Sequence, residues 1–398
     1  MTAIPTRSRT RDLDLLLGEA ARDLVGTVLD AVSDIGEVNS VRPTAVTVRP
    51  SGDALVRYAV EFRRRDGTVA RETLVAATGS LVPSGAAVVA GEVDGGRVEV
   101  GLWRWPHDPL LPALSHVVDG ERLRTLLAKA GVSPTAAPTV RVRSYRPRRS
   151  AVLTITCGAD QLFAKVVPPS ELPGLRRRHA LLAPHLPVPR PLVTTDDGLV
   201  LVPSLPGTPG RTALRREDRL PGPSVLEDLL DRLPHALTTL PSRSNHRRRA
   251  RHYAEVLALT VPEVGDEATA LADVIAETDA GEYPVVPVHG DFYEHQLLVH
   301  AGTVTGLLDI DTAGPGERLD DWANFLAHLA ITGTPRARDW ERDILRHVRD
   351  RFDPGHLRPR VASAVLGLAT GPFRTQSPEW TVRTRERVAL AGRWLSRS

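Results

Sequence analysis

The chain has 398 residues, 41% of them hydrophobic and 25% charged, which supplies ordinary hydrophobic cores and excludes disorder throughout. The single cysteine, Cys157, excludes an intramolecular disulfide and Cys-rich zinc modules. No apolar run approaches the roughly 20 residues that span a bilayer, and the first 14 residues are too polar for a signal peptide. We therefore expect a cytoplasmic protein of two or three domains that does not bind membranes.

The charge balance is nearly even, with a net charge of +3 and a sequence pI near 9.3. A basic pI raises the question of nucleic-acid binding. However, only two of the 51 basic residues are lysines, and arginine runs such as residues 63–65 and 176–178 alternate with acidic stretches. Aromatic residues make up 4% of the chain, which leaves little material for base stacking. We expect solvated basic faces and no nucleic-acid partner.

The first third of the chain predicts an α+β domain. Helical apolar spacing marks residues 13–32 and 110–130, and turn residues at 66–67 and 94–96 separate segments of strand-like composition. Residues 131–138 are small, uncharged and Pro-containing, so we interpret them as a linker. Residues 1–137 are thus predicted to fold separately, without a catalytic motif of their own. Their expected strands are 41–48, 54–62, 72–77, 86–93 and 97–103.

The pattern changes after the linker. Five predicted strands and one helix, over residues 172–186, make residues 138–205 a small β-rich lobe. Residues 206–398 are predominantly helical in pattern and form a second lobe. The expected strands are 140–144, 151–156, 161–167, 191–195 and 199–203, and the expected later helices are 225–240, 252–259, 268–278, 320–331, 340–351 and 382–395.

The first domain shares one local sequence pattern with the β-rich lobe. Arg49-Pro50 and Arg146-Pro147 each precede a predicted hairpin. A degenerate duplication explains this similarity, and coincidence in an Arg- and Pro-rich chain explains it as well.

The segment from residue 285 to 329 carries most of the chemistry. An apolar strand ends in His289-Gly290-Asp291, Gln296 follows, and a predicted hairpin ends in Asp309. Two carboxylates and one amide would thus meet at one rim. Phosphoryl transfer uses such a set, because one carboxylate accepts the hydrogen bond of the attacking hydroxyl while another carboxylate and an amide oxygen hold Mg²⁺. Any one of these aspartates, taken alone, is explained as a turn or cap residue. The whole ordered set of residues is not explained in that way.

This order of residues resembles the aminoglycoside phosphotransferase/choline kinase superfamily, whose fold is related to that of eukaryotic protein kinases. The resemblance implies a protein-kinase-like bilobal α+β fold preceded by an extra α+β domain, with ATP and Mg²⁺ as cofactors. It implies that Asp291 is the catalytic residue, that Gln296 and Asp309 are metal ligands, and that His289 and Asp321 support the loop. The matching positions are His289-Gly290-Asp291, Gln296, Asp309, Gly314-Pro315-Gly316 and Asp321-Trp322-Ala323.

The β-rich lobe supplies the expected nucleotide contacts. Lys165 lies in an apolar strand and resembles the kinase lysine that contacts the α- and β-phosphates, although an edge-strand lysine is the alternative. Arg146 and Ser150 belong to a glycine-free loop that would cover the phosphates. Val202 and Ser204 lie in the segment that would contact adenine at the hinge between the lobes.

Two features depart from the family pattern. Gln296 replaces the usual Asn, as in maltokinases, which also carry an N-terminal domain, but the residues at 309–311 differ from theirs. The helix after Lys165 lacks the usual glutamate, and the nearest acid, Glu171, comes early.

The sequence therefore predicts a kinase that transfers the γ-phosphoryl group of Mg-ATP to a hydroxyl of a small molecule. A sugar-like acceptor is favoured over an aminoglycoside, because residues 381–397 are basic. The alternative is a nucleotide-binding regulatory protein without turnover, which the missing helix glutamate favours. The identity of the acceptor and the oligomeric state stay open.

Overall fold

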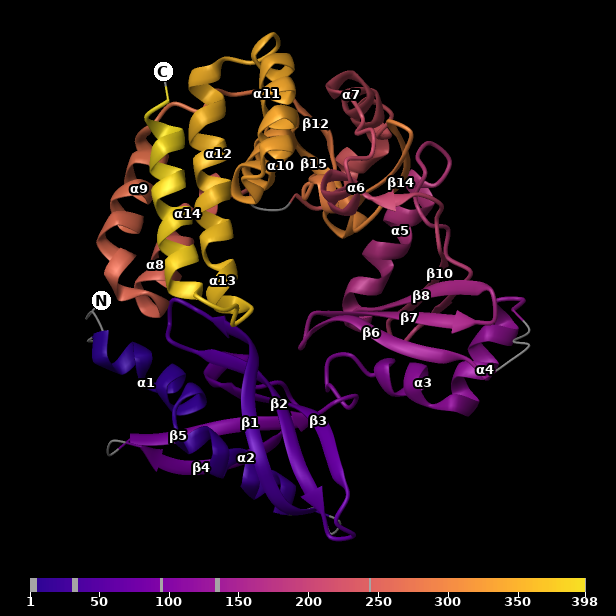
Figure 1. The fold of residues 1–398 in the computed structure, drawn as a ribbon, viewed down its shortest axis with the longest axis vertical. Coiled ribbons are helices and arrows are strands. Elements are labelled where there is room, and N and C mark those ends of the chain that lie inside the picture. The colour runs from indigo at the N-terminus through magenta and orange to yellow at the C-terminus, as the bar shows by residue number, and fades with distance from the viewer. Residues whose placement is uncertain (1–5, 31–34, 94–95, 133–136, 243–244, 398) are drawn as a thin grey trace.

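The computed structural model describes residues 6–30, 35–93, 96–132, 137–242 and 245–397. They form three parts (Figure 1): an N-terminal sheet with its helices at the bottom of the view, a second sheet at the right, and a helical part at the top. The expected turn at 94–95 and most of the expected linker, 133–136, lie outside the described residues.

The N-terminal part is a five-stranded antiparallel sheet covered by two helices. One helix was expected over 13–32, but two form, and they are separated at Gly18, a poor helix former. Alternate residues of the second strand, from Ala54 to Phe62, are buried against these helices. The elements are α1 (Thr6–Leu17), α2 (Ala20–Asp30), β1 (Ile35–Val48), β2 (Ala54–Arg64), β3 (Val69–Thr78), β4 (Ala87–Val93) and β5 (Gly96–Arg104), with sheet order β1-β2-β3-β5-β4.

The second part repeats this sheet topology. Its five strands are also antiparallel, and their order, β6-β7-β8-β10-β9, is the order of the first sheet. The difference is a helix, α5, inserted between the third and fourth strands. The elements are β6 (Thr139–Arg146), β7 (Ser150–Cys157), β8 (Asp160–Val166), α5 (Leu172–Leu182), β9 (Val193–Thr195) and β10 (Leu199–Pro203).

Two short helices join the first sheet to the second. α3 (Leu114–Val118) and α4 (Gly120–Lys129) replace the single helix expected over 110–130, because Asp119 caps α4 by accepting from two backbone N–H groups of its first turn. Leu114 and Leu127 on these helices belong to one hydrophobic cluster with residues of both sheets. The boundary at residue 137 stays a prediction, but the apolar core is continuous across it.

The third part is mostly helical, and its small strands carry the polar segment around residue 291. β12 pairs with β15, and β13 with β14, so the predicted hairpin ending at Asp309 forms. The elements are β11 (Thr208–Pro209), α6 (Gly210–Arg216), α7 (Pro223–Asp231), α8 (Ala250–Thr260), α9 (Gly265–Glu277), β12 (Val285–Val288), β13 (Leu297–His300), β14 (Thr303–Leu307), β15 (Gly314–Glu317), α10 (Arg318–Thr332), α11 (Pro335–Arg349), α12 (Pro354–Ala369), α13 (Gly371–Arg374) and α14 (Trp380–Leu395).

A buried arginine ties α12 to the start of α10. Arg360 is almost fully buried, and its guanidinium donates to the carbonyl oxygens of Ala280 and Gly281 at 2.8–3.1 Å. It also donates to Glu317 at 2.5 Å and to Asp320 at 2.8 Å. Five hydrogen bonds thus satisfy one desolvated cation, which is the condition under which a buried ion pair is tolerated.

Replacing Arg360 with Met should lower the free energy of unfolding by about 3–5 kcal/mol, the usual cost of breaking a buried ion pair from one side. The reason is that Glu317 and Asp320 would lose their shared cation. Urea denaturation measures this loss. The matched control is Arg342→Met, because the ion pair of Arg342 with Asp339 is exposed to solvent. Such a pair should contribute only about 0–1 kcal/mol to the free energy of unfolding. Equal urea midpoints of unfolding for the two variants would contradict the prediction.

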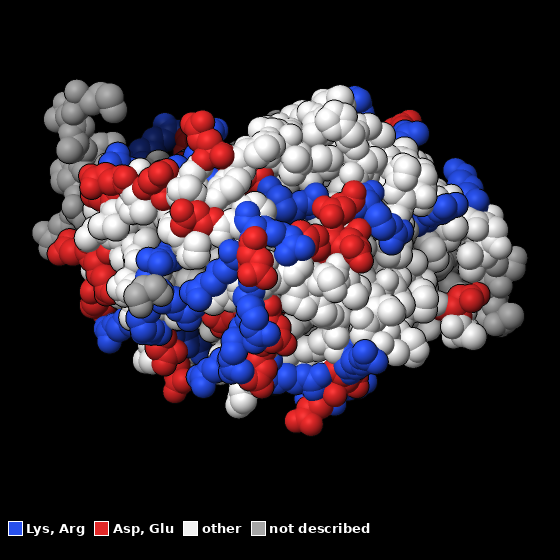
Figure 2. All heavy atoms as spheres, turned by 90° about the horizontal axis from the view of Figure 1, so that it is seen from above, with Lys and Arg blue, Asp and Glu red and all other residues white. Residues whose placement is uncertain are grey.

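The surface offers no structural sign of a membrane segment. Among the described helices, none is long and apolar enough to cross a bilayer. Seen from the top of Figure 1, basic and acidic side chains intermingle along a band across the face (Figure 2). This mixture matches the alternating charges of the sequence.

Candidate active site

The loop that follows β12 is held by a carboxylate of α10. The backbone N–H groups of His289 and Gly290 each donate to Asp321 at 2.8 Å. Gly290 has a φ of +79°, and a Cβ there would lie 2.7 Å from the carbonyl oxygen of Thr312, so only glycine fits. The His289 ring lies 2.9 Å, Nε2 to oxygen, from the carbonyl of Leu308, which connects the loop to the hairpin.

Asp291 projects from this loop between two amides. Gln296 donates to its Oδ2 and Asn324, one turn after Asp321 on α10, donates to its Oδ1, both at 3.3 Å. Burial raises the pKa of Asp291, and the neighbouring Asp309 adds to this effect, while His289 and Asn324 oppose it. The result is a carboxylate whose pKa lies above its ordinary range and whose two oxygens are both oriented.

Lys165 and Asp309 meet across the two lobes. The ammonium lies 2.8 Å from Asp309 and 2.6 Å from Asp311. β8 pairs with β7 on one side and β10 on the other, so Lys165 is on a central strand and the edge-strand alternative is wrong. Burial tends to lower the pKa of Lys165, but the two carboxylates outweigh it and raise that pKa. Conversely, burial tends to raise the pKa of Asp309, but Lys165 outweighs it and lowers that pKa.

The missing helix glutamate has a structural counterpart in Asp311. α5 faces the turn after Asp309 with a basic surface: Arg178 donates to the carbonyl of Ala313 at 2.8 Å, and His179 is buried beside it. Glu171 is exposed in a turn before α5, and within the described ranges no contact joins it to Lys165. The sequence reasoning missed Asp311, although its position two residues after Asp309 was visible.

The loop between β6 and β7 is fastened from the N-terminal part. Arg146 and Ser150 face each other at the end of this hairpin. Asp108, which is buried, accepts from the backbone N–H of Arg148 at 2.8 Å and from the Tyr145 hydroxyl at 2.9 Å. Arg148 adopts a positive φ of 65°, a conformation that non-glycine residues rarely adopt without such support. No motif or spacing in the sequence points to Asp108.

The segment expected at the hinge leads from the β-rich lobe to the helical part. Val202 lies on β10 opposite Phe163, and the N–H of Ser204 donates to the carbonyl of Gln161 at 3.0 Å. Beyond them, Thr305 donates to the carbonyl of Pro206 at 2.7 Å. These contacts fix the crossing between the lobes next to the hairpin that ends in Asp309.

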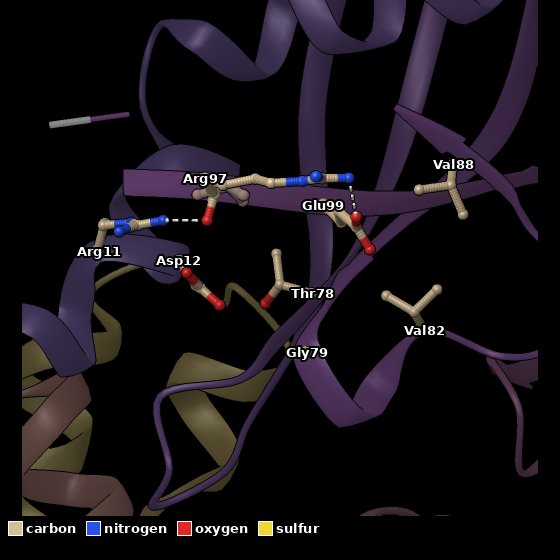
Figure 3. Close-up of a pocket in the computed structure, with 9 residues that line it drawn as sticks. Arg11, Asp12, Thr78, Gly79, Val82, Val88, Arg97 and Glu99 are labelled. Atoms are coloured by element: carbon tan, nitrogen blue, oxygen red, sulfur yellow. Dashed lines mark hydrogen bonds and ion pairs between the residues drawn. The ribbon is translucent and has the colours of Figure 1, made fainter. Parts of the chain in front are cut away.

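A separate cavity of about 430 Å³ lies in the N-terminal part (Figure 3) and contains none of the predicted site residues. Arg11 donates to the carbonyl of Arg97 there, and Arg97 pairs with Glu99.

The sheet, hinge and helical part together have the architecture of the protein-kinase-like superfamily. The model of the phosphotransferase enzyme family matches residues 136–359, more than half of the chain, and the chain belongs to this family. The fold class and family expected from the sequence are thereby confirmed. No curated protein matches the chain significantly.

Solved structures of similar fold include aminoglycoside phosphotransferase APH(4)-Ia. Its ternary complex with ADP and hygromycin B is 13% identical with a TM-score of 0.50, covering 69% of this chain and 99% of that chain. Its complex with AMP-PNP and hygromycin B is 14% identical with a TM-score of 0.51, covering 69% and 98%. Macrolide 2'-phosphotransferase MphH from Brachybacterium faecium is 21% identical with a TM-score of 0.42, covering 68% and 97%.

Proposed function

We propose that the protein is an ATP-dependent kinase that transfers the γ-phosphoryl group of Mg-ATP to a hydroxyl of a small molecule. The observation that carries the proposal is the convergence of Lys165 with the segment that holds Asp291, Gln296 and Asp309. These residues come from different lobes: Lys165 contacts Asp309 at 2.8 Å and Gln296 contacts Asp291 at 3.3 Å, and the carboxylates of Asp291 and Asp309 interact electrostatically. A sugar-like acceptor is favoured over an aminoglycoside, since the last helix is rich in arginine.

In this proposal each group has one task. Asp291 accepts the hydrogen bond of the acceptor hydroxyl and orients it, a task suited to a carboxylate with a raised pKa. Lys165 contacts the α- and β-phosphates, and the loop with Arg146 and Ser150 covers them. The backbone at Val202 and Ser204 receives the adenine ring.

The donor atoms suit Mg²⁺. Asp309 and Gln296 offer carboxylate and amide oxygens, the hard ligands that Mg²⁺ prefers, and Gln296 uses its nitrogen on Asp291, which leaves its oxygen available. In the part of the chain that the structure describes, no group of three His, Cys, Asp or Glu residues forms a metal cage. Mg²⁺ needs none, because it keeps waters and binds substrate phosphates. When bound, it would neutralise charge on those phosphates.

The direct test is ADP production from ATP with a panel of sugars, aminoglycosides and other alcohols, with and without EDTA. We expect acceptor-dependent turnover that EDTA abolishes. Turnover that does not depend on any acceptor, or that is indifferent to EDTA, would contradict the proposal.

A nucleotide-binding regulatory protein is the second candidate. It is favoured by the pairing of Lys165 with Asp309 and Asp311, since this ion pair occupies the group that would meet phosphate. Nucleotide binding in a thermal-shift assay without turnover of any acceptor is the result that this candidate requires.

Asn324→Ala should move the acidic limb of the pH–rate profile to higher pH. Asn324 donates to the ionised form of Asp291, so its removal raises the pKa of Asp291 further. Activity that requires ionised Asp291 is then lost at a higher pH as the medium is acidified. The profile of kcat/KM against pH measures the shift. The control is Thr269→Ala on α9, whose hydroxyl bonds only within its own helix. An unmoved acidic limb in Asn324→Ala would contradict the assignment.

Asp108→Ala should raise the KM for ATP by several-fold and change kcat less. Alanine has no acceptor for the hydrogen bonds from Tyr145 and Arg148, so the loop over the phosphates loses its support. Steady-state kinetics with varied ATP measures the effect. The matched control is Asp119→Ala, which removes the cap of α4 without touching the loop. An equal change of KM in both variants would make the effect one of general stability.

A further inference from the structure

A groove between α11 and α14 concentrates positive charge. Its volume is about 1280 Å³, and the last turn of α10 and one residue of α6 complete its wall. Two acidic residues, Glu341 and Glu386, line it against eight arginines. We call it the arginine groove; its arginines are Arg211, Arg338, Arg342, Arg349, Arg383, Arg387, Arg393 and Arg397.

The carboxylates of the protein neutralise only part of the arginine groove. Arg397 pairs with Glu341 at 3.2 Å, and Arg342 pairs with Asp339 at 2.9 Å. Arg387 interacts electrostatically with Arg211 and Arg383, and we call these three arginines the inner end of the groove. The side chains of Arg211 and Arg383 make no hydrogen bond or ion pair with any described residue, although Arg211 interacts at longer range with the buried carboxylate of Glu294.

A third arginine at the inner end is crowded by like charges. Arg387 donates to the carbonyl of Leu368 at 2.7 Å. Burial lowers the pKa of Arg387, and the neighbouring Arg383 and Arg211 lower it further, against a single opposing carboxylate, Glu386. Like charges held together repel, so an anion bound between them would be stabilised.

The inner end adjoins the candidate active site. His328 on α10 stacks on Tyr293 at 3.7 Å, two residues after Asp291. Burial lowers the pKa of His328 to about 3, and Arg211 and Arg387 contribute, so these arginines lie close to it. His328 is therefore neutral at physiological pH and adds no charge of its own.

A second connection runs through α13. Arg374 interacts electrostatically with Arg387 on one side and with Asp291 on the other. Arg374 is thus within electrostatic range of both Asp291 and the arginine groove.

We propose that Arg211, Arg383 and Arg387 bind a carboxylate or phosphate group of the acceptor whose hydroxyl lies at Asp291. The inference rests on the proposed function and narrows it: the acceptor is an anionic alcohol, such as a sugar acid or a sugar phosphate. A polycationic aminoglycoside would be repelled by the same groups. The groove is large enough for a ligand of this kind, since small-molecule sites typically measure ~300–1000 Å³.

The competing explanation is an ordinary solvated face in an arginine-rich chain. Arg71 and Arg251 are solvated arginines, with side chains that are 84% and 73% exposed, and each pairs with an acidic neighbour. Arg211 and Arg383 are exposed as well, and Arg387 is half-buried. The inner arginines differ in that they come from two separate helices, α6 and α14, and line one concavity.

The test uses the full-length chain with its nucleotide site filled by Mg-ADP, so that added anions cannot bind there. Isothermal titration calorimetry compares glucose, glucosamine, glucuronate and glucose 6-phosphate, with inorganic phosphate as a fifth probe. We expect at least one anionic sugar to bind at least 10-fold more tightly than glucose. Glucosamine should bind no better than glucose.

The variants are matched in charge. Arg211→Gln/Arg383→Gln should lower the affinity for the anionic sugar at least 10-fold, whereas Arg71→Gln/Arg251→Gln, with the same net charge, should not. Neither Arg211 nor Arg383 makes a hydrogen bond or ion pair with a described residue, so the first double variant should fold. A thermal midpoint equal to that of the control variant checks this.

The possible results separate the inference from the proposed function. Anion binding that depends on the inner arginines supports the inference even if no sugar is phosphorylated, in which case the proposed function fails alone. Turnover of neutral and anionic sugars with equal kcat/KM supports the proposed function and overturns the inference. Failure of all the anionic probes to bind better than glucose, or equal loss in both double variants, also overturns it.

Discussion

Asp291→Asn is expected to lower phosphoryl transfer by roughly 10²–10⁴-fold while leaving the affinity for Mg-ATP nearly unchanged. The amide keeps the size of the side chain but cannot accept a proton from the acceptor hydroxyl. It should still fit between Gln296 and Asn324 once Gln296 turns its amide so that the Gln296 oxygen accepts from the new amide nitrogen. A coupled assay measures the turnover, and calorimetry measures the affinity for Mg-ATP.

The same variant should be at least as stable as the natural chain at neutral pH. Burial raises the pKa of Asp291, so the folded state is destabilised once pH rises above that pKa and the group ionises. Asn cannot ionise and removes this cost. A midpoint of unfolding that is equal or higher excludes unfolding as the cause of lost activity. Near-normal turnover would remove Asp291 from its proposed role. Asp279→Asn, at an exposed turn, is the control.

Lys165→Arg should be nearly as damaging as Lys165→Ala, with kcat/KM for ATP lowered on the order of 10²–10³-fold in both. Lys165 is enclosed between neighbouring strands and two carboxylates, with 18% of its side chain exposed. The wider, planar guanidinium matches a pair of carboxylates well and would hold Asp309 and Asp311 more firmly, away from phosphate and metal. Alanine removes the cation altogether.

Lys129→Arg is the matched control, since Lys129 is the only other lysine and lies at the end of α4. It should leave kcat/KM unchanged. If Lys165→Arg retains most of the activity while Lys165→Ala does not, a positive charge is required there but the compact shape of an ammonium is not.

The sequence predicted the candidate site best where its residues lie close together in one short segment of the chain. The order from His289 to Asp321 spans three short strands and a helix start, and these local elements bring Asp291, Gln296 and Asp321 together almost by themselves. The same is true of the β-rich lobe, whose alternating apolar residues predicted five strands and one helix correctly.

The sequence pattern did not predict contacts between segments that are distant along the chain. Asp311 meets Lys165 across 146 residues, and a conventional glutamate was sought on α5 instead. Asn324 lies one helical turn after Asp321, so its position on the same face of α10 as the loop could have been read from spacing. Asp108 meets Tyr145 through tertiary packing of two sheets, which no local rule predicts.

The shared strand order of the two sheets bears on how the chain arose. If both descend from one duplicated lobe, the ancestor began with two equivalent nucleotide-binding surfaces, and selection needed to preserve only one. The first copy carries no charged residue over 73–78, the end of its third strand, where the second copy has Lys165. In the present chain the part that carries the first sheet supplies Asp108 instead, which holds the loop between β6 and β7 of the second sheet.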